Sequence, residues 1–155
     1  MTTLTLEAIK AEQNRIGDMI AAFEAQAAQA PSFFEYQGER ITLAPGELYV
    51  GTIISADSSK NHHVILLPGD MDDIKWDAAM AWAKSIGGDL PDRVEQSLLF
   101  ATMKDQFEEA AYWSNMQHAW ASGSAWFQLF SYGHQYDCVK GAELRARAVR
   151  RSIIQ

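Results

Sequence analysis

Residues 76–95 read WDAAMAWAKSIGGDLPDRVE, and this stretch decides the fold because it predicts one helix ending as another begins. Gly87 suits the left-handed residue that closes a helix, since glycine accepts a positive φ angle. The first helix carries its apolar residues on one face, at Trp76, Ala79, Met80, Ala83 and Ile86.

The second helix follows at once. Asp92 and Glu95 have the spacing of a capping box, in which each side chain accepts a hydrogen bond from a backbone amide of the first turn. The sequence predicts that this helix runs to about Lys104 or Phe107. Its apolar face continues through Leu98, Leu99 and Met103.

Extended segments with a period of two surround the helices. Upstream, residues 33–36 and 39–43 flank Gln37-Gly38, which predicts a tight hairpin. Residues 48–55 and 62–67 predict a second hairpin, and residues 68–73 a turn. Downstream, residues 112–115, 126–132 and 145–152 predict three short strands. Because strands are grouped rather than alternating with helices, we expect an α+β domain whose two helices cover a small antiparallel sheet.

Residues 5–30 predict an amphipathic helix that Pro31 ends. Two readings stay open: a short coiled coil that forms a homo-oligomer, or a helix that packs on its own domain. We therefore divide the chain into residues 1–30 and a domain of residues 31–155. One heptad seam position reads Leu6, Gln13, Ile20 and Ala27, and the other reads Ile9, Ile16, Phe23 and Ala30. The oligomerisation candidates are Leu6, Ile9, Ile16, Ile20 and Phe23.

The 155 residues carry a formal net charge of −7, which argues against a nucleic-acid partner gripped through a broadly basic face. No window is long and apolar enough for a membrane span, and the first residues have neither a basic flank nor an apolar core, so we expect no signal peptide. We expect a soluble protein of the virion or the host cytoplasm. The single cysteine, Cys138, excludes an intrachain disulfide.

The motifs from Trp76 onward resemble a known family. They are the glycine pair followed by Leu90-Pro91, Tyr112-Trp113-Ser114, Ala125-Trp126 with Phe130, and Arg147-Ala148-Val149-Arg150. In this order they resemble phage- and prophage-associated proteins of unknown function related to the C-terminal domain of the Legionella collagen-like protein. The resemblance covers about residues 48–151. It implies a C-type-lectin-like fold with the two chain ends brought close, and a binding face in the C-terminal aromatic region.

The aromatic segment supplies the candidate binding surface. We assign Trp113, Trp126 and Phe130 to the core, and Gln128 to either a hydrogen-bonded interior or the floor of a shallow site. Amphipathic aromatic and amide side chains in polar connections are typical of recognition surfaces. The ligand-binding candidates are Asn115, Gln117, His118, Trp120, Gln128, Tyr132, His134 and Tyr136.

Catalytic, metal and cofactor sites are not expected. His62 and His63 are adjacent in a strand, so they point to opposite faces and cannot chelate one ion together. The place of the calcium-binding strand in true lectins reads Trp113-Ser114-Asn115, without the carboxylate, which argues against calcium lectin activity. We interpret the acidic run of residues 70–73 as a solvated turn.

The sequence thus predicts a non-enzymatic module of phage or prophage origin that binds a protein or glycan through residues 115–136. One alternative is a virion or tail assembly component that oligomerises through the N-terminal helix. Another is an inhibitor of a host protein.

Overall fold

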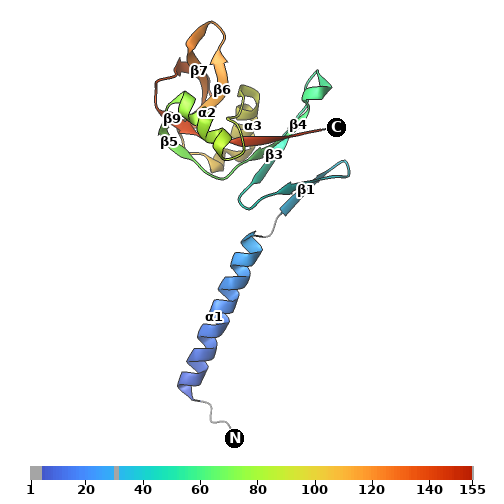
Figure 1. Cartoon of the computed structure of the whole chain (residues 1–155), viewed down its shortest axis with the longest axis vertical. Coiled ribbons are helices and arrows are strands. Elements are labelled where there is room, and N and C mark those ends of the chain that lie inside the picture. Colours follow the sequence, from blue (N-terminus) through green and yellow to red (C-terminus); the bar gives the residue numbers. More distant parts are fainter. Residues whose placement is uncertain (1–4, 30–31, 155) are drawn as a thin grey trace. The chain divides into compact units, whose positions relative to one another are not determined.

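The computed structural model describes residues 5–29 and 32–154 (Figure 1). The chain separates into two compact units, with the division between Pro45 and Gly46. The helices are α1 (Leu6–Gln29), α2 (Trp76–Ser85) and α3 (Arg93–Met103), with 3₁₀ turns at Ser58–Lys60 and Lys104–Gln106. The strands are β1 (Ser32–Tyr36), β2 (Glu39–Leu43), β3 (Leu48–Ile53), β4 (His62–Leu66), β5 (Met71–Ile74), β6 (Ala111–His118), β7 (Ala121–Leu129), β8 (Gln135–Val139), β9 (Leu144–Ala146) and β10 (Val149–Ile153).

The first unit contains α1 and the β1–β2 hairpin. Thr5 precedes α1, and its hydroxyl accepts a hydrogen bond from the amide of Ala8 at 3.2 Å, as an N-cap does. The predicted hairpin is confirmed: Gln37 and Gly38 both have positive φ angles, of 49° and 84°, as its tight turn requires. Ala30 and Pro31, which the sequence places at the end of the helix, lie outside the described residues. The proposed domain boundary at residue 30 stays a prediction.

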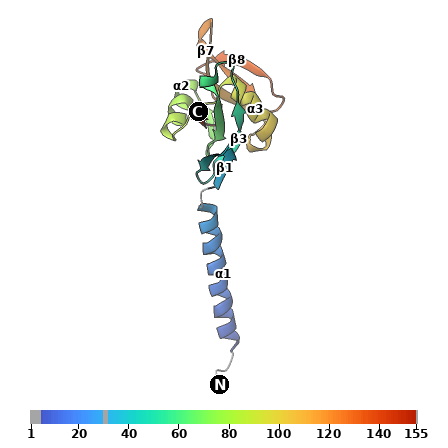
Figure 2. The same ribbon diagram turned by 90° about the vertical axis from the view of Figure 1, so that its right-hand side faces the viewer.

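The second unit is α+β, as the order of elements predicted. Strands β10, β4 and β3 form an antiparallel sheet in that order. A five-stranded sheet has the order β5-β9-β6-β7-β8 and is antiparallel except between β6 and β9. Helices α2 and α3 lie on opposite sides of the strands (Figure 2). No helix among the described residues is long and apolar enough to cross a membrane.

The hydrophobic core has two parts, one on the side of each helix. On the α3 side, Phe107 stacks on Phe130 with ring centroids 3.9 Å apart, and Tyr112 meets both rings edge-on. The buried members there are Val50, Val64, Leu66, Leu99, Tyr112, Phe130 and Val149. On the α2 side they are Leu67, Ile74, Ala79, Ala83, Leu90, Trp113, Ala125, Ala146 and Ala148.

The junction between α2 and α3 has the predicted geometry. Gly87 has a φ angle of 85°, and the amide of Gly88 donates to the carbonyl of Ala83 at 2.9 Å, which satisfies the helix end. A Cβ atom on Gly88 would lie 2.6 Å from the carbonyl oxygen of Val149, so this approach requires glycine. The chain then forms a bridge between Asp89 and Val149, and the capping box at Asp92 starts α3.

Four predictions about turns and strands are wrong in detail. The predicted turn at residues 68–73 contains strand β5, because Arg145 of β9 lies 3.2 Å from Asp70 and 3.1 Å from Asp72 and balances the acidic run. The polar connection after residue 132 contains β8, which pairs with β7. The predicted strand at residues 145–152 is two strands, β9 and β10, which belong to different sheets. Strand β7 ends at Leu129, so Tyr132 lies beyond it.

Candidate functional site

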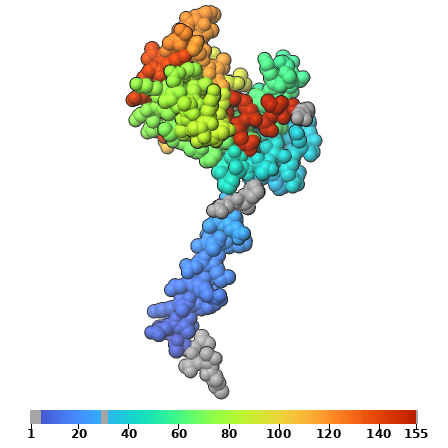
Figure 3. Space-filling view, viewed as in Figure 1, coloured from blue at the N-terminus to red at the C-terminus, as the bar shows by residue number. Residues whose placement is uncertain are grey.

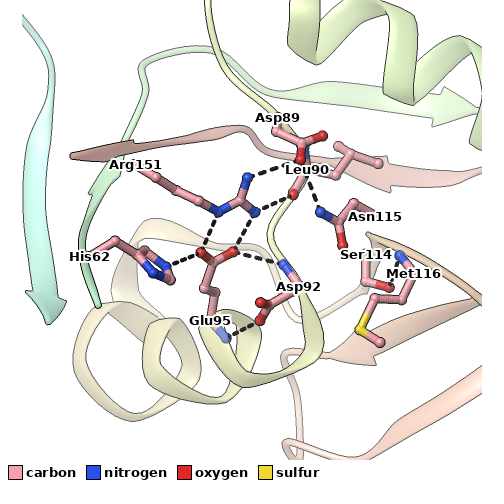
Figure 4. Close-up of polar contacts among 9 residues, drawn as sticks. All are labelled: His62, Asp89, Leu90, Asp92, Glu95, Ser114, Asn115, Met116 and Arg151. Atoms are coloured by element: carbon pink, nitrogen blue, oxygen red, sulfur yellow. Dashed lines mark hydrogen bonds and ion pairs between the residues drawn. The ribbon is translucent and has the colours of Figure 1, made fainter. Parts of the chain in front are cut away.

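A buried ion network fixes the start of α3 (Figure 4). The carboxylate of Glu95 is fully buried and receives two hydrogen bonds from the guanidinium of Arg151, at 2.6 and 2.7 Å. The Nε2 atom of His62 lies 2.8 Å from the same carboxylate, and the backbone amide of Asp92 donates to it at 2.8 Å. Arg151 also lies 2.9 Å from Asp89. Glu95 therefore ties α3 to β4 and β10 while capping its own helix.

The network lowers the pKa of Glu95. Burial is the largest single effect and raises this pKa because it penalises the charged form, while the hydrogen bonds and positive charge of Arg151 lower the pKa. The amide of Asp92 and the hydrogen bond with His62 lower the pKa further. Since the same contacts raise the pKa of Arg151, both groups remain charged at neutral pH.

This pKa shift predicts a pH-dependent stability. The folded pKa of Glu95 lies below the ordinary value of 4.5, so its ionisation stabilises the fold above that pH. The contribution is lost as the pH falls through the folded pKa. Urea unfolding of the wild type and of Glu95→Gln should therefore show a stability difference that shrinks from about pH 6 to about pH 3. An unchanged difference over this range would contradict the role assigned to the ionised carboxylate.

A second group of contacts, centred on Arg93, lies on the exposed side of α3. The guanidinium of Arg93 sits 3.7 Å above the ring of Trp126, and its Nε atom donates to the side-chain oxygen of Gln135 at 2.9 Å. The side-chain nitrogen of Gln135 donates in return to the backbone carbonyl of Arg93 at 2.6 Å and to the side chain of Gln128 at 2.8 Å. Strand β8 and the sheet therefore hold this guanidinium in place.

A shallow groove of about 390 Å³ lies beside this arginine. Among the described residues, the two terminal nitrogens of Arg93 have no hydrogen-bond or ion-pair partner. Val94 and Met116 are 60% and 41% exposed, so the groove combines an available cation with apolar walls. The residues that line it are Arg93, Val94, Ser97, Met116 and Gln135.

A row of rings continues from the groove to the tip of the β6–β7 hairpin. The ring of His118 stacks on Trp126 with centroids 5.3 Å apart, and Trp120 lies 6.0 Å from His118. Trp120 is 93% exposed at the hairpin tip, which projects from the rest of the second unit (Figure 3). We call Arg93, Val94, Met116, His118 and Trp120 the groove surface.

The other predicted ring residues lie elsewhere. Tyr136 contacts Phe127 on the opposite face of the sheet from Trp126, because adjacent residues of a strand point to opposite faces. His134 lies between the exposed rings of Tyr132 and Tyr136, with centroids 6.4 and 6.0 Å away. The structure thus divides the predicted surface into two separate groups of rings.

The amide side chains predicted to bind a ligand form hydrogen bonds within the protein. Gln128 is 1% exposed and donates to the carbonyl of Gly133. It is therefore a hydrogen-bonded interior residue and not the floor of a shallow site. The side-chain nitrogen of Asn115 donates to Asp89 at 2.9 Å, and Gln117 accepts a hydrogen bond from Lys140. In the predicted core, Trp113 and Phe130 are buried, but Trp126 is only half-buried because its ring faces Arg93.

Met116 and Gln135 fall within the predicted binding segment of residues 115–136, whereas Val94, Ser97 and the role of Arg93 were not predicted. One signal was present: Arg93 occupies the first turn of a helix, where the helix dipole disfavours a cation. A cation in that position has to be explained by a contact elsewhere. Val94 and Ser97 carry no such signal, because they line a groove only once the pairing of β8 with β7 brings Gln135 to α3.

The described residues contain no group of three or more histidine, cysteine, aspartate or glutamate side chains that could hold a metal ion. His62 contacts Glu95, while His63 points the other way and contacts Tyr49 and Thr52. Burial raises the pKa of the Cys138 thiol, and the charge of Asp137 raises it further, which disfavours the thiolate.

Neither a protein-family model nor a curated protein matches this sequence.

Proposed function

We propose that the second unit is a non-enzymatic binding domain with a C-type-lectin-like fold. Two helices on sheets that are antiparallel except between β6 and β9 support this proposal, as does the position of β10 beside β4, which brings the last strand next to the strands that open the unit. The order of the motifs around Gly87-Gly88, Glu95 and Trp113 supports a phage or prophage origin.

The groove surface is the proposed binding site. The observation that carries this assignment is the guanidinium of Arg93, which is held against Trp126 and Gln135 while its terminal nitrogens have no partner among the described residues. An arginine fixed in this way has already lost its side-chain freedom, so binding an anion there carries a smaller entropic cost.

A protein segment fits this surface better than a glycan. The groove presents aliphatic side chains at Val94 and Met116 beside the cation, and tryptophan, arginine and methionine are the side chains enriched at protein interfaces. The ring of Trp126, which lies beside the groove, is already in contact with Arg93 and His118 and is therefore less open to stacking by a sugar ring. We therefore propose a ligand that places an aspartate or glutamate next to an apolar residue.

A peptide selection tests this proposal. The full chain is used to select binders from a random peptide library, and fluorescence anisotropy measures their affinity. We expect acidic residues beside apolar ones, and a loss of affinity of at least about tenfold in Arg93→Gln, because a charge-assisted hydrogen bond is removed. Trp120→Ala should also weaken binding, whereas Tyr136→Ala on the opposite face is the matched aromatic control and should bind normally.

Two outcomes would contradict the proposal. The first is selected peptides that bind equally well to wild type and Arg93→Gln. The second is no peptide enrichment combined with binding to a glycan array, which would replace the protein ligand with a sugar. Unfolding curves of each variant separate loss of binding from loss of fold.

A further inference from the structure

Helix α1 exposes an apolar stripe along its 24 residues. Its described side chains are exposed, including six large apolar ones that are between 48% and 73% exposed. These are Leu6, Ile9, Ile16, Met19, Ile20 and Phe23. Isolated helices are marginal in water, and most helices gain their stability from covering an apolar face. We therefore expect a partner to cover this apolar stripe.

The surface along the stripe has holes like those of a coiled-coil helix. Two hollows lie along it, each lined by five residues, and four of the five occupy consecutive d, g, a and d heptad positions; Ala8 completes the first lining and Glu24 the second. Four residues in this pattern form a hole that accepts a side chain from a facing helix. The first set is Ile9, Glu12, Gln13 and Ile16, and the second is Ile16, Met19, Ile20 and Phe23.

The charges beside the stripe indicate which partner covers it. Glu12 and Arg15 form an ion pair within the helix, at 2.7 Å. Lys10 and Glu24 are the charged residues at heptad position e, and among the described residues neither has an ion-pair partner. They lie near opposite ends of the helix. Lys10 of one copy of α1 could therefore pair with Glu24 of a second copy, and Glu24 of the first copy with Lys10 of the second.

We propose that α1 pairs with α1 of a second copy in an antiparallel coiled coil. In antiparallel pairs, e positions face e positions, so Lys10 of each chain meets the partner's Glu24, and the ion pair forms twice. A parallel pair would instead place g beside e, which sets Glu12 against Gly17 and Met19 against Glu24. Only the antiparallel orientation brings opposite charges together.

The same antiparallel register also brings the remaining apolar residues of the two helices together. With Lys10 beside the partner's Glu24, the two helices overlap along their full described length, and Ile16 lies level with the partner's Ile20. Gly17 then meets the partner's Gly17 near the middle. A glycine inside a helix is unfavourable, and apart from its chain neighbours and the backbone of α1 no atom lies within 4 Å of the place of its Cβ in the single chain. A close helix crossing accounts for its position.

The oligomeric mass of the full chain is the first test. Sedimentation equilibrium should give twice the chain mass of 17.3 kDa. In Ile16→Gln/Ile20→Gln the dissociation constant should rise by about a hundredfold or more, because two buried apolar layers are lost. Ala21→Gln/Ala25→Gln, on the far side of the helix, is the matched control and should remain dimeric. A monomer or trimer for the wild type would overturn the proposal.

Charge reversal tests the orientation. Lys10→Glu and Glu24→Lys should each weaken the dimer by about tenfold, because attraction becomes repulsion at two places, and the double variant should restore it. A spin label at Ala28→Cys, with Cys138→Ser, should report a separation of about 30 Å, since the two labels lie 20 residues apart along an antiparallel pair. Absence of rescue, or a short distance typical of parallel helices, would reject the antiparallel pair.

Discussion

Replacing Glu95 with alanine is expected to lower the free energy of unfolding by about 3 to 5 kcal/mol. The carboxylate is fully buried, and its removal would leave Arg151 without the partner that holds two of its nitrogens. His62 and the amide of Asp92 would each lose an acceptor as well. Urea denaturation followed by circular dichroism measures the loss.

An exposed ion pair in the same unit gives the control. Lys60 lies 3.8 Å from Asp57, with both side chains more than half exposed, so Lys60→Ala should cost less than about 1 kcal/mol. If Glu95→Ala costs no more than this control, the network does not support the fold in the way its geometry indicates.

Replacing Trp113 with alanine is expected to cost a similar amount, about 3 to 5 kcal/mol. The indole is fully buried in the core on the α2 side, and its N–H group donates to the carbonyl of Ile74 at 2.8 Å. The substitution therefore creates a cavity and also leaves a buried carbonyl without its donor. Thermal and urea unfolding should both report the loss.

Trp120→Ala removes an equally large side chain and serves as the matched control. Because Trp120 is 93% exposed, this variant should keep its unfolding free energy within about 0.5 kcal/mol of the wild type. The proposed function adds that Trp120→Ala loses ligand affinity. Comparable destabilisation by both substitutions would mean that the hairpin tip is part of the core.

The prediction for Glu95 bears on the binding site as well as on stability. Glu95 anchors the first turn of α3, and Arg93 belongs to that turn. The buried network therefore determines where the guanidinium of Arg93 stands relative to Trp126. We expect loss of Glu95 to weaken peptide binding through misplacement of Arg93, although Glu95 itself is inaccessible to a ligand.

The local elements of this fold could be predicted because their determinants lie within a few residues of each other. The capping box joins Asp92 to Glu95 across three residues, and the end of α2 needs only the positive φ of Gly87. The turn at Gln37-Gly38 is equally local. The heptad pattern predicted the helix α1, and its self-association stays a proposal.

The sequence by itself therefore determined the helices, their caps, two hairpins and the α+β class, since backbone preferences and periodicity act over short distances. Only the tertiary structure decided which aromatic residues are available to a ligand. Tyr136 and Trp126 fall on opposite faces because β8 pairs with β7, and Arg93 gains its place because Gln135 reaches it from 42 residues away. Contacts between residues so far apart depend on how the strands assemble, which no short pattern in the chain encodes.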